Sequence, residues 1–154
     1  MITIRKSTAT DVEFISAHAY RLVEFGPPKW RDQQLMTQAD IKHNITAILS
    51  GNPDVETFIA IDDTGEACGF IYLTMQADYY TQEPHAHITD IAVTKKAEGK
   101  GVGKLLLQKA DEWARQKNAR WITLNVFAGN THAQAVYEKA GFQKEWIKYL
   151  KQLG

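Results

Sequence analysis

Three glycines at alternating positions mark the point where a β-rich run changes into a helical pattern. They are Gly99, Gly101 and Gly103, and four lysines lie among or beside them. Glycine allows backbone angles that turn successive N–H groups toward one point, and a helix N-terminus adds about half a positive charge. The spacing therefore predicts a binding site for a phosphate or diphosphate group.

Two other phosphate-binding motifs do not match the sequence of this loop. The dinucleotide fingerprint needs a third glycine or alanine where this chain has Lys104. A P-loop needs glycine in place of Glu98 and serine or threonine in place of Leu105. A tight turn without a ligand and a solvated run of lysines are the alternatives, but one glycine usually suffices for a turn.

A second motif follows the loop at residues 130–142. Its letters are Asn130, Ala133, Tyr137, Gly141 and Phe142. Together with the loop at 98–103 and a strand that ends in Val93, this motif resembles the GNAT superfamily of N-acetyltransferases. The loop of that family reads Arg/Gln-x-x-Gly-x-Gly/Ala, and its second signature reads Asn-x-x-Ala-x-x-x-Tyr-x-x-x-Gly-Phe. The resemblance is strongest over residues 86–142.

The resemblance implies acetyl-CoA as cosubstrate and no metal. The loop would hold the diphosphate, and strand backbone would pair with the pantetheine arm. The family has Arg or Gln where this chain has Glu98, and a carboxylate repels phosphates, so Lys96 or Lys100 would compensate or Glu98 would turn outward. The cofactor-binding residues implied are Ile91, Ala92, Val93, Glu98, Gly99, Lys100, Gly101, Val102, Gly103, Lys104, Asn130 and Tyr137.

The resemblance also implies that an amine attacks the thioester directly in a ternary complex. A backbone N–H near Ile91 or Ala92 would polarise the thioester carbonyl. Tyr137 would donate a proton to the departing thiolate, and packing of its ring is the alternative role.

An ammonium must lose a proton before it attacks, so a base is expected near the acceptor. Asp90 is the first candidate because it lies on the strand that carries the reacting carbonyl, where burial would raise its pKa. A hydrogen-bonding role in the fold is the alternative for Asp90. Glu24, at the end of the first helix, is the second candidate, with a solvated helix end as its alternative.

The acceptor is expected to be a small primary amine, such as a polyamine, an amino acid or an aminoglycoside-like compound. Aromatic faces in loops can hold a cationic amine, although loop anchoring is the commoner role. His85 and His87 have a spacing that suits a metal, but no third ligand accompanies them. A protein acceptor and a non-catalytic CoA-binding module are the rival functions. The expected acceptor-site residues are Glu24, Trp30, Tyr79, Tyr80, His87 and Asp90.

Composition limits the rival functions. A chain of 154 residues fits one domain over residues 1–154. Eighteen basic residues balance eighteen acidic ones, so we expect no nucleic-acid or membrane partner. Cys68 is the only cysteine and is expected to pack in the core. No segment approaches the ~20 apolar residues of a membrane span, and we expect a cytoplasmic protein.

The elements that position these residues are expected to form an α/β fold. Its mostly antiparallel mixed sheet is twisted and flanked by helices on both faces, in the order β-α-α-β-β-β-α-β-α-β. We expect Ile88, Asp90 and Ala92 to share one face of their strand. The last strand offers an edge through which a homodimer could form. Strands are expected at residues 2–5, 57–61, 67–74, 86–93, 121–126 and 145–150, and helices from Thr8 or Thr10, from Thr37, from Val102 to Asn118 and over 131–139.

Overall fold

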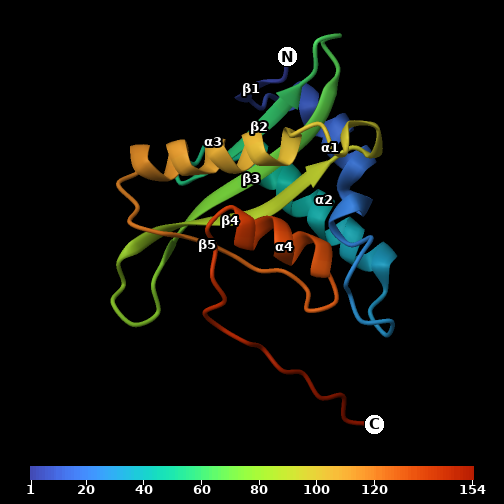
Figure 1. The fold of residues 1–154 in the computed structure, drawn as a ribbon, viewed down its shortest axis with the longest axis vertical. Helices are drawn as coiled ribbons and strands as arrows, with labels where there is room; N and C mark the ends of the chain where they lie inside the picture. The colour runs from blue at the N-terminus through green and yellow to red at the C-terminus, as the bar shows by residue number, and fades with distance from the viewer.

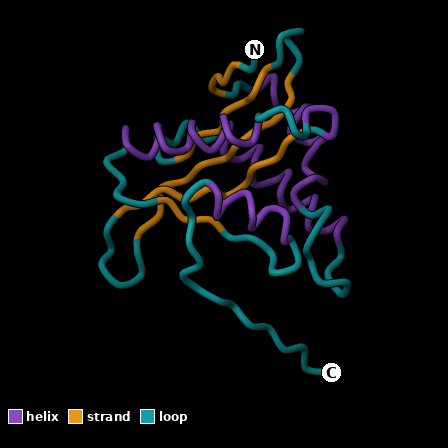
Figure 2. The backbone as a smooth tube through the Cα atoms, viewed as in Figure 1, coloured by secondary structure: helices purple, strands orange, loops and turns teal.

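The computed structural model describes residues 1–154 as a five-stranded sheet with helices on both faces (Figures 1 and 2). Neighbouring strands are antiparallel, except that β4 and β5 are parallel. The predicted α/β fold with a mixed, mostly antiparallel sheet is confirmed. The strands, in spatial order, are β1 (Thr3–Lys6), β2 (Val55–Ile61), β3 (Ala67–Ala77), β4 (Pro84–Val93) and β5 (Ile122–Leu124).

The helices form two layers, each with its own apolar core. On one face, α1 (Val12–His18) and α2 (Gln33–Leu49) cover a small cluster around Ile15 and Phe70. On the other face, α3 (Val102–Gln116) and α4 (Thr131–Lys139) cover a larger cluster that includes Leu106 and Cys68. Three short 3₁₀ turns, η1 (Ala9–Asp11), η2 (Ala19–Leu22) and η3 (Lys95–Ala97), complete the set. None of the helices has both the length and the apolar character needed to cross a membrane.

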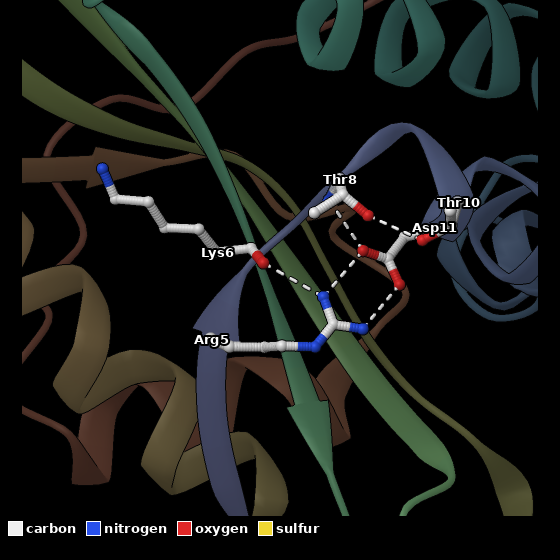
Figure 3. Close-up of polar contacts among 5 residues, drawn as sticks. All are labelled: Arg5, Lys6, Thr8, Thr10 and Asp11. Atoms are coloured by element: carbon white, nitrogen blue, oxygen red, sulfur yellow. Dashed lines mark hydrogen bonds and ion pairs between the residues drawn. The ribbon is translucent and has the colours of Figure 1, made fainter.

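Asp11 ties the first helical layer to the sheet (Figure 3). Its carboxylate accepts two hydrogen bonds from the Arg5 guanidinium, each 2.8 Å long, and one from the backbone N–H of Thr8, also 2.8 Å. The Arg5 hydrogen bonds hold the pKa of the Asp11 carboxyl below its ordinary value, against the effect of burial. The first helical segment thus starts from Thr8, one of the two predicted starts, with Asp11 as its capping partner three residues later.

A bulge in β4 changes which side chains face which helical layer. Tyr72 pairs with Asp90 and Leu73 pairs with Ile88, so Thr89 has no partner on β3. An extra residue shifts the alternation of side chains by one. Ile88 therefore lies in the core beneath α3, whereas Asp90 faces α2. The expectation that Ile88 shares a face with Asp90 is wrong for this reason.

One edge of β4 has no neighbouring strand over its second half. β5 pairs with β4 only at Ala86, His87 and Ile88, and it ends at Leu124, earlier than the sequence predicted. From residue 90 to residue 93, β4 pairs with β3 alone, and Thr89 pairs with neither strand. We refer to residues 89–93 as the open edge, because their ladder groups on the β5 side have no strand to bond with.

The start of one helix and the absence of one strand also differ from the prediction. Helix α2 begins four residues before Thr37, because Asp32 caps it by accepting hydrogen bonds from the N–H groups of Gln34 and Leu35 at 2.9 and 3.1 Å. The strand predicted at 145–150 does not form. Alternating apolar residues need a ladder partner to become a strand, and this segment extends away from the sheet (Figure 1). Its large apolar side chains are exposed: Trp146, Ile147, Tyr149, Leu150 and Leu153.

Candidate functional site

The glycine loop surrounds the N-terminus of α3. Gly99 and Gly101 have φ angles of +74° and +80°, and Gly101 is the N-cap of the helix. A Cβ added at either glycine would meet nothing within 4 Å, so the backbone angle is what requires glycine here. The N–H groups of Gly101, Val102, Gly103 and Lys104 donate to no group of the protein. These four donors are available to an anion, as the sequence predicted for the loop.

Two of the four lysines of the loop are free to reach an anion. Lys95 pairs with Glu24 at 3.3 Å, and Lys96 pairs with Glu66 at 3.4 Å. Lys100 and Lys104 are exposed and take part in none of the nine ion pairs of the structure. The positive charge beside the free N–H groups therefore comes from Lys100 and Lys104.

Arg21 neutralises the carboxylate that the loop carries at Glu98. The guanidinium, 10% exposed, donates to Glu98, to Glu24 at 2.5 Å and to the backbone carbonyl of Val93 at 3.0 Å. At the position where the GNAT motif has Arg or Gln, this chain thus has a glutamate that is paired with an arginine from η2. Sequence reasoning could not find this pair, because Arg21 and Glu98 are 77 residues apart.

Glu24 belongs to the same ionic network. Burial raises the pKa of its carboxyl, but hydrogen bonds from Arg21 and Lys95 outweigh burial and hold that pKa below its ordinary value. A carboxylate stabilised in its ionised form is a weak proton acceptor. The geometry therefore favours Asp90 over Glu24 as the base.

Asp90 lies at the bulge of β4, half-buried beneath α2. Its Oδ2 atom accepts a hydrogen bond of 2.7 Å from the side-chain amide of Asn44. Burial, and then the charge of Asp40, raise the pKa of Asp90 to about 7, although the Asn44 hydrogen bond acts in the opposite direction. A carboxyl with this pKa can both take up and release a proton near neutral pH. It also lies within the open edge, next to Ile91.

The second sequence motif forms α4 and its entry. Asn130 caps the helix by accepting a 3.2 Å hydrogen bond from the N–H of Ala133. Tyr137 is half-buried, with its ring against Phe142 and against the core beneath α3. Burial raises the pKa of the Tyr137 phenol, so the group stays protonated, as a general acid must be. Packing and proton donation are therefore compatible roles for this residue.

Two glycines bring the helical layers into contact beyond the end of β5. A Cβ at Gly26 would lie 2.8 Å from the Cβ of Asn130, and a Cβ at Gly129 would lie 3.1 Å from the carbonyl oxygen of Gly26. The loop between η2 and α2 therefore lies against the loop that leads into α4 (Figure 1).

The predicted aromatic residues of the acceptor site do not come together. Tyr79 and Tyr80 lie in the β3–β4 turn, beyond Pro84, and β4 runs roughly 20 Å from Pro84 to Asp90. Tyr80 instead stacks on Trp146, with 6.2 Å between the ring centroids. Tyr79 and Tyr80 therefore lie at the far end of β4 from Asp90, because β3 and β4 extend further than predicted, and their place at the acceptor stays a prediction. Trp30 lies in the loop before α2, under the Arg31 guanidinium.

His87 joins β4 to β5 rather than forming a metal site. Its Nδ1 atom is hydrogen-bonded to Thr123 Oγ1 at 2.7 Å. Burial, and then the charge of His85, lower the pKa of His87, so its ring is neutral at neutral pH. His85 stacks on Trp121, 5.6 Å away. No group of three or more potential metal ligands occurs in the structure.

A hollow of about 290 Å³ opens on the other side of the loop, next to the β2–β3 turn. Lys96 and Lys100 line it together with three carboxylates, those of Asp62, Asp63 and Glu66. Carboxylates repel phosphate, so this hollow is not the expected diphosphate site.

Comparisons with known sequences agree with the motifs. The sequence model described as the acetyltransferase (GNAT) family matches residues 18–142. The uncharacterized N-acetyltransferase YdgE of Bacillus subtilis is 36% identical over 92 residues, which cover 60% of this chain and 57% of that protein. Streptothricin acetyltransferase of Streptomyces lavendulae is 32% identical over 89 residues, covering 58% and 45%. The chain thus spans about half the length of the curated relatives it matches.

Solved structures share the fold over nearly the whole chain. The aminoglycoside N-acetyltransferase AAC(6')-Iy in complex with CoA gives a TM-score of 0.76 at 22% identity, over 99% of this chain and 95% of that one. The ribosomal-protein-alanine N-acetyltransferase of Brucella melitensis biovar Abortus 2308 gives 0.73 at 16% identity, over 99% and 100%. At these identities the likeness shows the fold.

Replacing Gly101 with alanine should weaken CoA binding while the chain stays folded. A left-handed backbone costs a side-chain-bearing residue roughly 1–2 kcal/mol, and relief of that strain would turn the free N–H groups away. Calorimetric titration with CoA should show a rise in Kd of about ten-fold or more.

Gly51→Ala is the matched control, because Gly51 also has positive φ (+63°) with open space around it but lies just after α2. Equal CoA affinity in both variants would contradict the role of the loop.

Proposed function

We propose, because this chain belongs to the acetyltransferase (GNAT) family, that it transfers the acetyl group of acetyl-CoA to the nitrogen of a small primary amine. One arrangement carries the proposal: a strand edge without a neighbour runs from Asp90 to Val93 and leads into a loop of free backbone N–H groups. The first feature fits an extended pantetheine arm, and the second fits a diphosphate.

The residues that would hold acetyl-CoA come from three elements. Backbone groups of Ile91, Ala92 and Val93 would bond to the pantetheine arm, and the N–H groups of residues 101–104 would bond to the diphosphate, with Glu98 kept neutralised by Arg21. Asn130 would border the arm from the start of α4. The bound cosubstrate supplies an activated acetyl thioester.

The chain's own groups would then handle charge and protons. A backbone N–H of Ile91 or Ala92 stabilises the negative charge that develops on the thioester oxygen, a task for which fixed dipoles suffice. Asp90 takes the proton that the ammonium must lose, and Tyr137 gives a proton to the departing thiolate. The acceptor site would also be bordered by the side chains of His87, Trp30 and Glu24. A homodimer remains a prediction.

Two observations favour a small amine over a protein acceptor. The acceptor side carries the carboxylates of Asp90 and Asp40, which attract a free ammonium. Streptothricin acetyltransferase is among the relatives, by its name an enzyme that acetylates a small molecule. Protein acetyltransferases also share the fold, so the assay below includes a peptide.

Thiol release from acetyl-CoA tests the proposed function directly. The purified chain should release CoA thiol only when an amine is added, and the panel should hold alkyl monoamines, diamines, an aminoglycoside, amino acids and a peptide with a free N-terminus. Release with small amines alone is the expected result. Tight binding of acetyl-CoA without thiol release for any amine would instead make the chain a CoA-binding module.

Tyr137→Phe should lower kcat with a good acceptor by about 100-fold or more, because general acid catalysis contributes at least that much. The phenyl ring keeps the contact with Phe142, so the fold and the KM for acetyl-CoA should stay unchanged. An unaltered kcat would remove Tyr137 from the role of proton donor.

The pH dependence of kcat/KM should reflect the ionisation of Asp90. Because the base acts in its ionised form and the pKa of Asp90 is about 7, kcat/KM should rise with pH through neutrality and level off above it. Asp90→Asn should abolish this limb and lower kcat/KM by about 100-fold or more. A limb that persists near pH 7 in Asp90→Asn would assign the base elsewhere.

A further inference from the structure

Asp40, Asn44 and Asp90 form a compact polar group between α2 and β4. Asn44 is 0% exposed and lies between the two aspartates. Its side-chain amide donates to Asp90 Oδ2 at 2.7 Å and to the backbone carbonyl of Asp40 at 2.9 Å. Asp40 is one helical turn before Asn44, which places its carboxyl beside the same space, half-buried. One turn of α2 thus adds a second carboxyl and an amide to Asp90.

This group has hydrogen-bond acceptors that the protein does not use. The Oδ1 atom of Asn44 is buried without any hydrogen-bond partner. Neither Asp40 nor Asp90 takes part in an ion pair, whereas Asp11 and Glu24, which are also shielded from water, both do. Buried carboxylates and amide oxygens are normally satisfied, so an unpartnered amide oxygen beside two carboxylates without ion pairs points to a cationic ligand.

None of the neighbouring elements forms an ion pair with this group. On α2, His43 lies near Asp40 and partly offsets the rise in the Asp40 pKa that burial causes. On β3, Tyr72 pairs with Asp90, and its phenol pKa is raised by burial and then by the Asp90 charge. On η2, the guanidinium of Arg21 is engaged by Val93, Glu24 and Glu98. The surroundings of Asp90 therefore favour positive charge from outside.

We propose that Asp40, Asn44 and Asp90 together bind the ammonium group of the acceptor, and that the acceptor is a primary amine with no carboxylate next to its nitrogen. An ammonium has three N–H donors, and the cluster offers three acceptor groups, the two carboxylates and the Asn44 oxygen. A carboxylate on the neighbouring carbon would meet two like charges, so free α-amino acids are excluded. This assignment rests on the proposed function and narrows its substrate class.

The proton balance follows from these positions. One ammonium proton passes to the Asp90 carboxylate, the amine lone pair forms the C–N bond with the acetyl carbon, and the C–S bond breaks. Tyr137 donates a proton to the thiolate. The second proton on the amine nitrogen leaves as the amide forms and restores the phenol through solvent. Ammonium and acetyl-CoA thus give an amide, CoA thiol and one proton that Asp90 returns to solvent.

A matched pair of substrates tests whether a carboxylate next to the amine excludes a compound from the site. The pair is 1-aminobutane and 2-aminopentanoate, which differ by a carboxylate on the carbon that bears the amine. Wild-type enzyme should favour 1-aminobutane in kcat/KM by about 100-fold or more, because like charges brought together cost that much. Equal use of the two compounds would overturn the assignment.

Asp40→Asn tests the residue itself. The KM for 1-aminobutane should rise about ten-fold or more, since a charge-assisted hydrogen bond is lost, while kcat and the KM for acetyl-CoA stay unchanged. The acid limb of the pH profile should move to lower pH, because the charge of Asp40 raises the pKa of Asp90. Asp40→Glu should restore the amine KM at least in part. A merely structural role would move neither the limb nor the preference between the two amines.

Asp111→Asn, an exposed change on α3, is the control and should leave all these values unchanged. If wild-type enzyme acetylates amines but Asp40→Asn keeps the wild-type amine KM, the assignment of Asp40 is overturned while the proposed function stands. If wild-type enzyme acetylates no amine at all, the proposed function fails and this assignment fails with it.

Discussion

The site depends on the early separation of β5 from β4. Backbone N–H and C=O groups in a folded chain need partners, and β4 satisfies them along one side through β3. On its other side, pairing stops at Ile88, and the chain resumes ordered structure only at α4. The open edge therefore presents fixed polar groups that no second strand satisfies. A ligand with an extended, amide-containing arm satisfies such groups without any rearrangement of the sheet.

Charge is separated along this edge although the chain as a whole is neutral. At one end, Lys100, Lys104 and the N-terminus of α3 favour an anion. At the other end, Asp90 and Asp40 favour a cation. Arg21 lies between the two ends and, together with Lys95, neutralises Glu98 and Glu24, so that neither carboxylate disturbs the anion site. A substrate pair made of a diphosphate and an ammonium matches this polarity.

Local features of the fold and of the site could be predicted from the sequence. The loop glycines and a helix start at Thr8 or Thr10 depend on neighbours a few residues away, and the sequence was sufficient to predict them. Asp90, and burial as the main cause of its raised pKa, were also predicted, but the contributions of Asp40 and Asn44 were not, because both residues come from α2, more than forty residues earlier.

Features that depend on pairing register or on distant partners could not be predicted. The bulge at Thr89 places the side chain of Ile88 on the opposite face of the sheet from Asp90, and no residue type in β4 indicates the bulge. The Arg21–Glu98 ion pair joins elements 77 residues apart. The turn with Tyr79 and Tyr80 lies far along β4 from Asp90, because strand length determines where a hairpin turn lies. The alternation over residues 145–150 indicated a strand, but the sheet offers that segment no edge.

Amide hydrogen exchange with and without CoA tests the central claim, that main-chain groups of the open edge and of the loop hold the cosubstrate. CoA should slow exchange at the amides of residues 91–93 and 101–104 and leave β1 and β2 unchanged. Exchange that stays the same across both segments at saturating CoA, or protection confined to other elements, would contradict the account.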